Sequence, residues 1–476
     1  MWETKMTEIV APSQQAAGTS AEAPTSWATE FRATFALAWP LVIAQVAQNA
    51  INTTDVIMTG WLGPEYLAAS TLASTFIMPF LVGGIGLVGA VAPLTAQARG
   101  ARDIKAVRRI VRQGFWVALL TALVLVPIIL QIRTILGWLG QDPVLAMRAE
   151  EYTQIAAWLL FPGLGIIVLR SLLSTFDAAR VVLLVTLGGV VVNFIGNYAL
   201  MFGNFGMPRL ELRGAAISTV ITNIAMFLAL LTYVLRHRRF KRFHLLIRFW
   251  KPDWPRFRQI FRLGLPIGLT VLAEVSLFTA AAMLMGRLGT DEVAAHAVAL
   301  QCASLAFMVP MGIGMATTVR VGIAYGRRDR VGISHAGWTG LALGTAFMTL
   351  SCFAFLSFGP SIVSVFLDPT KPENLNALTL AATFLVIAGI FQLVDGVQVV
   401  AAHALRGLSD AKIPMIVAIV GYWLVGLPIA YLLGLVVGWR GIGIWIGLAA
   451  GLAFVAVVLL ARFALRERIG LLRQIS

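Results

Sequence analysis

Residues 413–437 read IPMIVAIVGYWLVGLPIAYLLGLVV, an apolar segment without Asp, Glu, Lys or Arg. About 20 consecutive apolar residues are enough for an α-helix to cross the hydrocarbon core of a bilayer. Further predominantly apolar segments lie near residues 34–58, 66–97, 113–132, 152–176, 181–203, 213–235, 260–286, 293–325, 333–358, 374–404 and 441–462. The sequence therefore predicts an all-α polytopic membrane protein with twelve transmembrane helices.

The composition agrees with a membrane location. Of the 476 residues, 59% are hydrophobic and 12% are charged, whereas soluble domains carry about 25% charged residues. The formal net charge of +15 is also a feature of nucleic-acid-binding proteins. Here, however, Lys and Arg gather in short segments between the apolar runs, as in the cytoplasmic loops of membrane proteins. We therefore expect the lipid bilayer, and no nucleic acid, as the partner of the chain.

The distribution of basic residues predicts the orientation of the chain, because cytoplasmic loops are enriched in Lys and Arg. With the N-terminus inside, 28 of the 37 Lys and Arg residues fall in cytoplasmic segments and seven fall in outer loops. The other two, Arg170 and Arg320, fall within predicted helices. The sequence thus predicts a multi-pass protein of the plasma (inner) membrane with both termini in the cytoplasm. A mobile tail is expected at 1–33 and a second tail at 466–476.

The two halves of the sequence repeat at a constant offset, without a gap over two helices. Aligned in this way are Leu37-Ala-Trp-Pro40 with Leu263-Gly-Leu-Pro266, Gly60 with Gly286, Gly100 with Gly326, and Asp103 with Asp329. We call the separation between Pro40 and Pro266 the repeat offset. Because each half has six helices, an even number, both halves begin on the same side of the membrane. We therefore expect two parallel six-helix lobes, 34–235 and 260–465, around a central cleft. A basic cytoplasmic linker at 236–259 joins them.

Three carboxylates lie well inside predicted helices: Asp55, Glu274 and Asp395. An ionised side chain at the bilayer centre costs about 2.5–3.5 kcal/mol on insertion scales, so such a residue usually has a partner or a function. No basic residue lies within two helical turns of Glu274 or Asp395 in the sequence. The two acids therefore predict a site for Na⁺, H⁺ or a cationic substrate, since hard oxygen ligands suit Na⁺. The alternative is a pair of protonated or hydrogen-bonded structural acids.

A polar face in the first lobe is a second candidate site. Its residues are spaced three or four apart and so share one face of each helix. They are Gln45, Gln48, Asn52 and Asp55 on the first predicted helix, and Asn193 and Asn197 on the fifth. Lipid cannot form hydrogen bonds with these groups, so both faces should turn inward and form a polar pocket. Alternatively, they only hold helices together through hydrogen bonds.

Motifs for other chemistries are absent from the sequence. No GxxxxGK[ST] phosphate loop exists, which argues against ATP as the direct energy source. The five histidines show no metal-binding spacing, and Cys302 and Cys352 lie separately within apolar segments. We therefore expect neither an enzyme nor a bound cofactor.

Several motifs resemble those of the multidrug and toxic compound extrusion (MATE) transporters, over nearly the whole chain from about residue 34. The resemblance is closest to their NorM-like branch. The motifs are Asn52-Thr-Thr-Asp55 with Met58-Thr-Gly60, Gly264-Leu-Pro-Ile-Gly268, Glu274-Val-Ser-Leu-Phe278, Ala294-Ala-His-Ala-Val-Ala-Leu300, Pro310-Met-Gly-Ile-Gly-Met315 and Leu405-Arg-Gly-Leu-Ser-Asp410. The resemblance implies export of small organic cations by antiport with Na⁺ or H⁺, through alternating access of two lobes. It also implies that the protein functions as a monomer.

The resemblance also implies roles for individual residues. In NorM-like members a glutamate and an aspartate serve the coupling cation, a role that carries over to Glu274 and Asp395 as candidate Na⁺ ligands. Phe391 and Gln392 would lie near this site, and some members have a tyrosine where this chain has Phe391, so one oxygen ligand is missing here.

In the first lobe the resemblance carries over to Asp55, Asn193 and Asn197. The coupling ion is the only small ion or molecule that the mechanism would need besides the substrate.

Two other functions remain open at this level. A lipid-linked precursor flippase has a related architecture, but its cleft should favour cationic residues that hold a phosphate-bearing substrate. Here the clearest charges inside predicted helices are acidic. A membrane-embedded receptor or enzyme is the second alternative, and the missing catalytic motifs and the internal repeat argue against it.

Overall fold

The computed structural model describes residues 26–472, apart from 242, 246, 248, 368, 372 and 373. Among the described residues, twelve helical segments are long and apolar enough to cross a membrane, and none of these residues forms a strand. The prediction of an all-α protein with twelve transmembrane helices is therefore confirmed.

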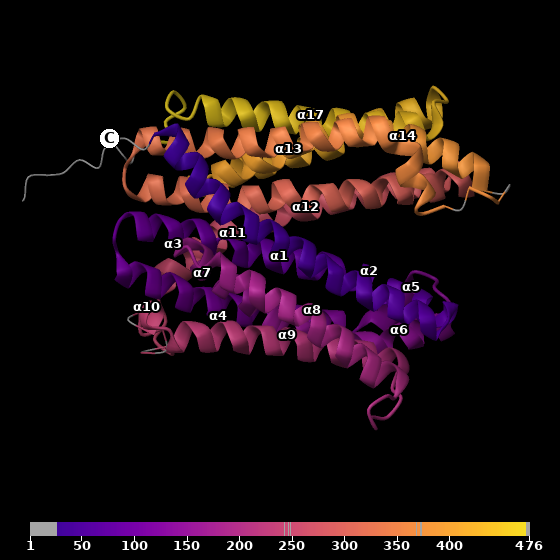
Figure 1. Ribbon diagram of the computed structural model, residues 1–476, viewed down its shortest axis with the longest axis horizontal. Coiled ribbons are helices and arrows are strands. Elements are labelled where there is room, and N and C mark those ends of the chain that lie inside the picture. Colours follow the sequence, from indigo (N-terminus) through magenta and orange to yellow (C-terminus); the bar gives the residue numbers. More distant parts are fainter. Residues whose placement is uncertain are drawn as a thin grey trace, which may run out of the picture.

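Successive segments run in opposite directions along the bundle (Figure 1). In the first half they are α1 (Trp27–Leu62), α2 (Pro64–Gly89), α3 (Val91–Gly100), α4 (Ile104–Ile129), α5 (Ile132–Trp138), α6 (Pro143–Ala156), the 3₁₀ turn η1 (Ala157–Leu159), α7 (Leu160–Thr175), α8 (Ala179–Phe202), α9 (Glu211–Arg236) and α10 (Arg238–Lys241). In the second half they are α11 (Trp254–Gly286), α12 (Thr290–Gly326), α13 (Arg330–Ser364), α14 (Leu375–Gly407), α15 (Lys412–Ile419), the π-helical segment η3 (Val420–Gly426), α16 (Leu427–Tyr431), the π-helical segment η4 (Leu432–Val436) and α17 (Arg440–Ala464). Three membrane segments are composite: α2 with α3, α6 with η1 and α7, and α15 to η4.

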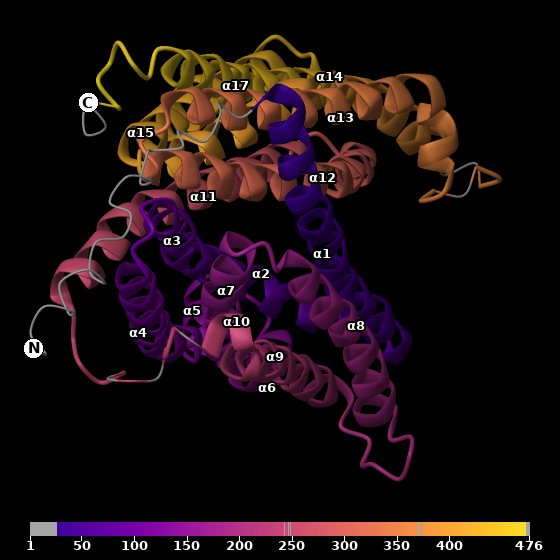
Figure 2. The same cartoon turned by 60° about the vertical axis from the view of Figure 1, so that its left-hand side comes forward.

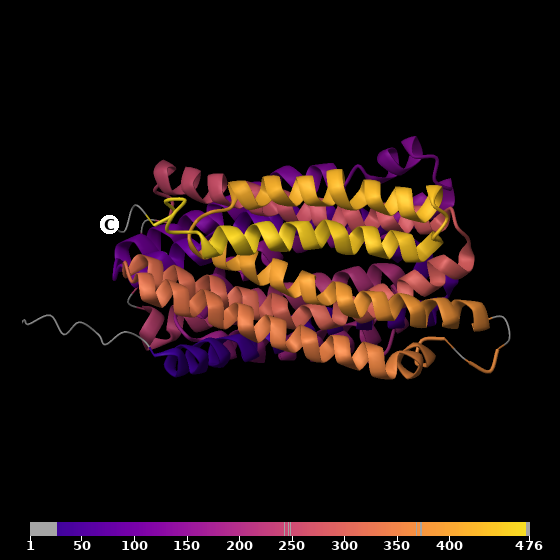
Figure 3. The same ribbon diagram turned by 90° about the horizontal axis from the view of Figure 1, so that it is seen from above.

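The helices form two lobes, each with its own hydrophobic core. One core collects residues mainly from α1 to α9, and the other collects residues mainly from α11 to α17. Figure 1 shows α12, α13, α14 and α17 on one side of the molecule and α4, α8 and α9 on the other. Figure 3 shows long helices of the second lobe lying side by side. The predicted two-lobe architecture is therefore present.

The internal repeat is visible in the backbone. α12 begins and ends one repeat offset after the composite helix α2–α3, and α13 begins one repeat offset after α4. Gly63 and Gly289 precede these helices with φ of 134° and 142°, a conformation that residues with a side chain rarely adopt. Asp103 and Asp329 then cap α4 and α13, each accepting a backbone N–H at 2.8 Å. Both halves thus share one topology and one direction, as expected for parallel repeats.

The first helix of each lobe departs from the predicted division at 34–235 and 260–465. Leu37 of α1 packs into the core of the second lobe, whereas Ile260 and Ile267 of α11 pack into the core of the first. Figure 2 shows α1 passing from one lobe to the other. Pro40 and Pro266 lie inside these two helices at equivalent positions, and a proline removes a helical hydrogen bond and allows a bend. Each lobe therefore receives the first turns of the other lobe's first helix.

The predicted N-terminal tail at 1–33 is partly wrong. α1 begins at Trp27 and is capped by Ser26, whose Oγ accepts the backbone N–H of Thr29 at 3.3 Å. The apolar run starts later in the sequence because Glu30 interrupts it, but Glu30 is buried and accepts Arg320 Nε of α12 at 2.7 Å. This pair makes the first turns part of the fold. Residues 1–25, and 473–476 of the predicted C-terminal tail, lie outside the described residues.

The predicted linker at 236–259 is also partly helical, since it contains α10 and the start of α11. It lies at the end of the bundle where α1 and α4 begin and α12 and α14 end. We call this end, which carries the segments 99–112, 236–262, 327–330 and 462–468, the basic end. The other end is the opposite end.

The lobes contact each other closely in the half of the bundle nearest the basic end. A Cβ on Gly100 would overlap the carbonyl oxygen of Ile323, and a Cβ on Gly326 would overlap that of Gln97. The two contacts are related by the repeat offset. Gln97 Nε2 also donates to the carbonyl oxygen of Gly407 at 2.9 Å. Small residues thus let the backbones of the two lobes meet at this end.

Within the second lobe, Gly447 tests how tightly the helices pack. A Cβ at Gly447 of α17 would overlap the backbone of Ala430 in α16. We expect Gly447→Ala to destabilise the protein by about 1–3 kcal/mol, the usual cost of overpacking. The measurement is the melting temperature of the purified protein in detergent. Gly163→Ala is the matched control, because nothing lies within 4 Å of its added Cβ. Equal melting temperatures for the two variants would contradict this packing.

Candidate functional site

Glu274 and Asp395 line one cavity in the second lobe, which we call the acidic cavity. Glu274 lies on α11 and Asp395 on α14, and the cavity has a volume of about 460 Å³. The two carboxylates interact electrostatically. Most of the other lining residues are apolar, with the hydroxyls of Thr279 and Ser304 among them. The structure therefore brings together the two acids that the sequence singled out, in surroundings where a cation is strongly attracted.

Asp395 has an oxygen without a partner. Its side chain is 5% exposed, and within the described residues no donor bonds to Oδ1. A buried acceptor without a hydrogen bond costs about 1–3 kcal/mol, and more when it is charged. A cation or a proton at Oδ1 would remove this cost, so the atom is a candidate ligand.

The described residues contain no group of three or more His, Cys, Asp or Glu side chains that could hold a metal ion. A Na⁺ ion in the acidic cavity would therefore need hydroxyl, carbonyl or water oxygens in addition to the carboxylates of Glu274 and Asp395.

Phe391 and Gln392, both predicted near the coupling site, play different parts. Phe391 lines the acidic cavity and packs edge-to-face against Phe278 and Trp445, at ring-centroid distances of 6.2 and 5.8 Å. Gln392 is buried, and its Oε1 accepts a hydrogen bond from Ser351 of α13 at 2.7 Å. Phe391 is thus a wall of the cavity, whereas Gln392 ties α14 to α13.

Arg406 is a neighbour of Glu274 that the sequence did not reveal. The predicted helix boundary at 404 leaves Arg406 in a loop, but α14 continues to Gly407. Arg406 and Glu274 line a narrow pocket of about 30 Å³ and interact electrostatically, without an ion pair within 4 Å among the described residues. Arg406 follows Asp395 by eleven residues, which is three helical turns, so helical spacing could have placed both on one face.

Asp55, Asn193 and Asn197 come together in the first lobe. Nδ2 of Asn193 and Nδ2 of Asn197 donate to Asp55 Oδ1 at 3.0 and 2.7 Å. Thr219 of α9 donates its hydroxyl to Asp55 Oδ2 at 2.8 Å. The cluster joins α1, α8 and α9. Thr219 gave no signal in the sequence, because hydroxyl residues are common in transmembrane helices.

Gln48 and Asn52 do not join this cluster. Asn52 is exposed and Gln48 is partly exposed, and in the described part of the chain no hydrogen bond connects either to Asp55. Because α1 crosses between the lobes, the same helix face meets different neighbours along its length. Gln45 lines a cavity between the lobes, whereas Asp55 faces α8 and α9. This corrects the expectation of one continuous polar pocket.

The cavity that Gln45 lines has a volume of about 330 Å³ and lies between the two lobes. We call it the interlobe cavity. α1, α2, α3 and α7 line it from one side, and α11, α12 and α14 from the other. Its polar lining residues are Gln45, Arg170, Ser171, Ser174, Thr318, His403 and Arg406. The charge argument against a flippase therefore does not hold, because basic side chains also lie inside the helices.

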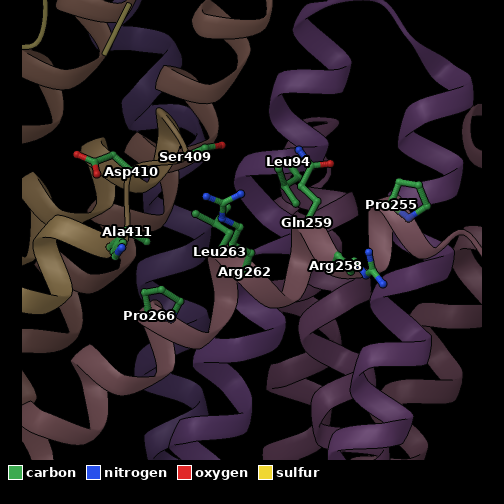
Figure 4. A pocket seen from close by; sticks show the side chains of 11 residues that line it. Leu94, Pro255, Arg258, Gln259, Arg262, Leu263, Pro266, Ser409, Asp410 and Ala411 are labelled. Atoms are coloured by element: carbon green, nitrogen blue, oxygen red, sulfur yellow. The ribbon is translucent and has the colours of Figure 1, made fainter. Parts of the chain in front are cut away.

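A further pocket, of about 560 Å³, lies at the basic end (Figure 4). Figure 4 shows Asp410 on the turn before α15, Arg258 on α11, and Arg262 between them. Arg258, Arg262 and Lys412 are exposed, and Asp410 accepts a hydrogen bond from Arg462 at 2.6 Å. Water can solvate these charges, so the pocket does not need a ligand to compensate them.

A sequence model described as MatE matches residues 40–199 and 266–432. The two matches begin at Pro40 and Pro266, the positions that define the repeat offset. Together they cover more than half of the chain.

Two relatives and two solved structures are similar over nearly the whole chain. The chain is 43% identical over 447 residues to the "Probable multidrug resistance protein NorM" of Mesorhizobium japonicum, covering 93% of this chain and 96% of that protein. It is 45% identical over 458 residues to the protein of the same name from Rhizobium meliloti, covering 96% and 97%. The eukaryotic MATE transporter AtDTX14 superposes with a TM-score of 0.85 at 20% identity, covering 94% and 98%. An outward-facing multidrug resistance MATE family transporter gives 0.84 at 20% identity, covering 93% and 96%. The two structures confirm the fold.

The cluster around Asp55 predicts a difference between two substitutions. Asp55→Ala leaves three donors on two other helices without their acceptor, whereas Asp55→Asn keeps one acceptor oxygen. We expect Asp55→Ala to lower the free energy of unfolding by about 1–3 kcal/mol and Asp55→Asn by clearly less. Melting temperatures in detergent measure the difference. Equal losses would mean that these hydrogen bonds do not hold α1 against α8 and α9.

Proposed function

Because the chain belongs to the MatE family and is a multidrug efflux transporter of that family, we propose that it exports small organic cations by antiport with Na⁺ or H⁺. The observation that carries this proposal is the acidic cavity, where Glu274 and Asp395 meet and one oxygen of Asp395 has no partner. The absence of a phosphate-loop motif from the sequence agrees with an ion gradient as the source of energy.

In the proposed exchange, the coupling cation and the substrate compete for the same acids. Na⁺ or H⁺ enters from outside, neutralises Glu274 and Asp395 and displaces the substrate. The loaded protein then opens to the cytoplasm and releases the ion. The membrane potential contributes about 2.3 kcal/mol per charge per 100 mV to this movement. No bound cofactor and no catalytic step are needed.

The lobe contacts support alternating access as the route. With Lys and Arg on the cytoplasmic side, the basic end is the cytoplasmic end, in the plasma (inner) membrane, with both termini inside. The close contacts of Gly100 and Gly326 then close the path to the cytoplasm. Opening requires the lobes to part there and approach each other at the opposite end. All sites lie within one chain, so we propose that a monomer is the working unit.

The flippase alternative gains some support from Arg170 and Arg406 in the interlobe cavity. The relatives at 43% and 45% identity are nevertheless described as probable multidrug resistance proteins. We therefore keep multidrug efflux, and the arginines need an explanation within it.

The proposal predicts that neutral replacements of the two acids abolish coupling. In proteoliposomes, Glu274→Gln and Asp395→Asn should each reduce gradient-driven ethidium efflux at least tenfold, because neither amide can be neutralised by a cation. A Na⁺ gradient and a pH gradient, imposed separately on the wild-type protein, identify the coupling ion.

Glu65→Gln is the control for this experiment, because Glu65 is 75% exposed and pairs with Arg148 at the opposite end. Monodisperse protein after reconstitution shows that each variant folds. Efflux at the wild-type rate by both Glu274→Gln and Asp395→Asn would refute the proposed coupling site.

A further inference from the structure

Two arginines line the interlobe cavity without an acid in direct contact. Arg170 of α7 contacts the sulfur of Met315, and Arg406 of α14 donates to His403 Nε2 at 3.2 Å. Neither forms an ion pair within 4 Å in the part of the chain that the structure describes. Other arginines of the bundle do have such partners: Arg320 with Glu30, Arg440 with Glu292, and Arg462 with Asp410. Basic residues inside membrane helices that lack a direct partner indicate a ligand.

His403 lies close to both arginines and orients one of them. It interacts electrostatically with Arg170 and with Arg406. The hydroxyl of Thr318 donates to the carbonyl oxygen of His403 at 2.8 Å, so it must accept from Nδ1, which lies 2.9 Å away. With the proton on Nδ1, Nε2 is free to accept from Arg406. His403 is therefore a neutral positioning residue, and the positive charge of the cavity comes from the two guanidinium groups.

Ser174 is a second, independent sign of a ligand. Its side chain is 4% exposed and lines the interlobe cavity, and within the described residues its Oγ has no hydrogen-bond partner. Ser174 follows Arg170 by four residues on α7, so the two share one helix face. A buried hydroxyl without a partner, beside a guanidinium group, is suited to donate a hydrogen bond to an anion.

The charges around the cavity select the kind of anion. Arg406 borders Glu274 in the narrow pocket, and Glu274 borders Asp395 in the acidic cavity. Two arginines and two ionised acids have no net charge together. A simple anion therefore leaves the acids uncompensated, and a simple cation leaves the arginines uncompensated. A molecule with both charges satisfies both groups.

We propose that the interlobe cavity binds the carboxylate of zwitterionic organic substrates, between Arg170, Arg406 and Ser174, while their positive group faces Glu274. Guanidinium groups bind carboxylates through paired, charge-assisted hydrogen bonds. The inference rests on the proposed efflux function and deepens it, because it specifies a class of substrate.

Two dyes that differ only in a carboxylate test the inference. Rhodamine B carries a cationic ring system and a free carboxylate, and its ethyl ester carries the same cation alone. Binding of each dye to the purified full-length protein in detergent at pH 7.5 is measured by fluorescence anisotropy. We expect Arg170→Gln to weaken rhodamine B binding about tenfold or more, and ester binding less than twofold.

Three further variants make the test specific. Arg170→Lys should keep most of the preference for rhodamine B, because it keeps the charge. Ser174→Ala should weaken rhodamine B binding several-fold and leave ester binding unchanged, and it carries the test if Arg170→Gln does not fold. Arg133→Gln is the control, since Arg133 is 64% exposed and lies outside the cavity. Unchanged binding, or equal weakening of both dyes, by Arg170→Gln and Ser174→Ala would overturn the inference.

Efflux of the ester separates this inference from the proposed function. If an ion gradient drives ester efflux but the variants do not discriminate between the dyes, the carboxylate site is refuted and the function stands. If neither gradient drives efflux of either dye by the wild-type protein, the proposed function fails, and the inference fails with it.

Discussion

Ionised groups lose much of their hydration when they enter hydrocarbon, and each needs compensation from a neighbour or a ligand. In this chain the charged side chains of the helices fall into two classes. One class forms direct pairs that hold helices together, such as Glu30 with Arg320 across the two lobes. The other class has no ion pair within 4 Å among the described residues and lines cavities. It consists of Glu274, Asp395, Arg170 and Arg406. The same physical constraint thus separates structural charges from those available to an ion or a substrate.

The second class is accessible only because the two lobes meet closely at one end. Gly86 packs on the backbone of Gly268, and the equivalent Gly312 packs on Val42. These contacts follow the internal repeat, so each lobe contributes the same surface to the junction. Contacts of this kind depend on van der Waals packing and few polar bonds, so they can be exchanged for others without leaving many charges unpaired. Glu30 and Arg320 are an exception to the symmetry, because the equivalent positions are Arg256 and Leu94, which cannot form an ion pair.

Sequence patterns predicted those features that depend on one segment at a time. Helix number follows from the length of apolar runs, and Glu274 and Asp395 were conspicuous because charges are rare in such runs. Thr219 and Ser174 could not be recognised, because only their neighbours show whether a hydroxyl in an apolar helix has a role. Arg406 was missed because helix ends are uncertain by a few residues. The exchange of α1 and α11 between the lobes depends on packing between helices, which no single segment encodes.

Glu274 occupies a junction between an acid and a base. It lines the acidic cavity with Asp395 and the narrow pocket with Arg406, which also lines the interlobe cavity. Two unit charges about 6 Å apart, at an effective dielectric constant of about 20, interact by about 3 kcal/mol, which is comparable to typical coupling energies between sites. In the proposed exchange, an ion that neutralises Glu274 removes the attraction for a positive group and leaves Arg406 freer to hold a carboxylate. A purely cationic substrate then loses its partner, whereas a zwitterionic substrate exchanges one attraction for another. The ion gradient should therefore expel simple cations more strongly than zwitterions, as a direct consequence of the two neighbours of Glu274.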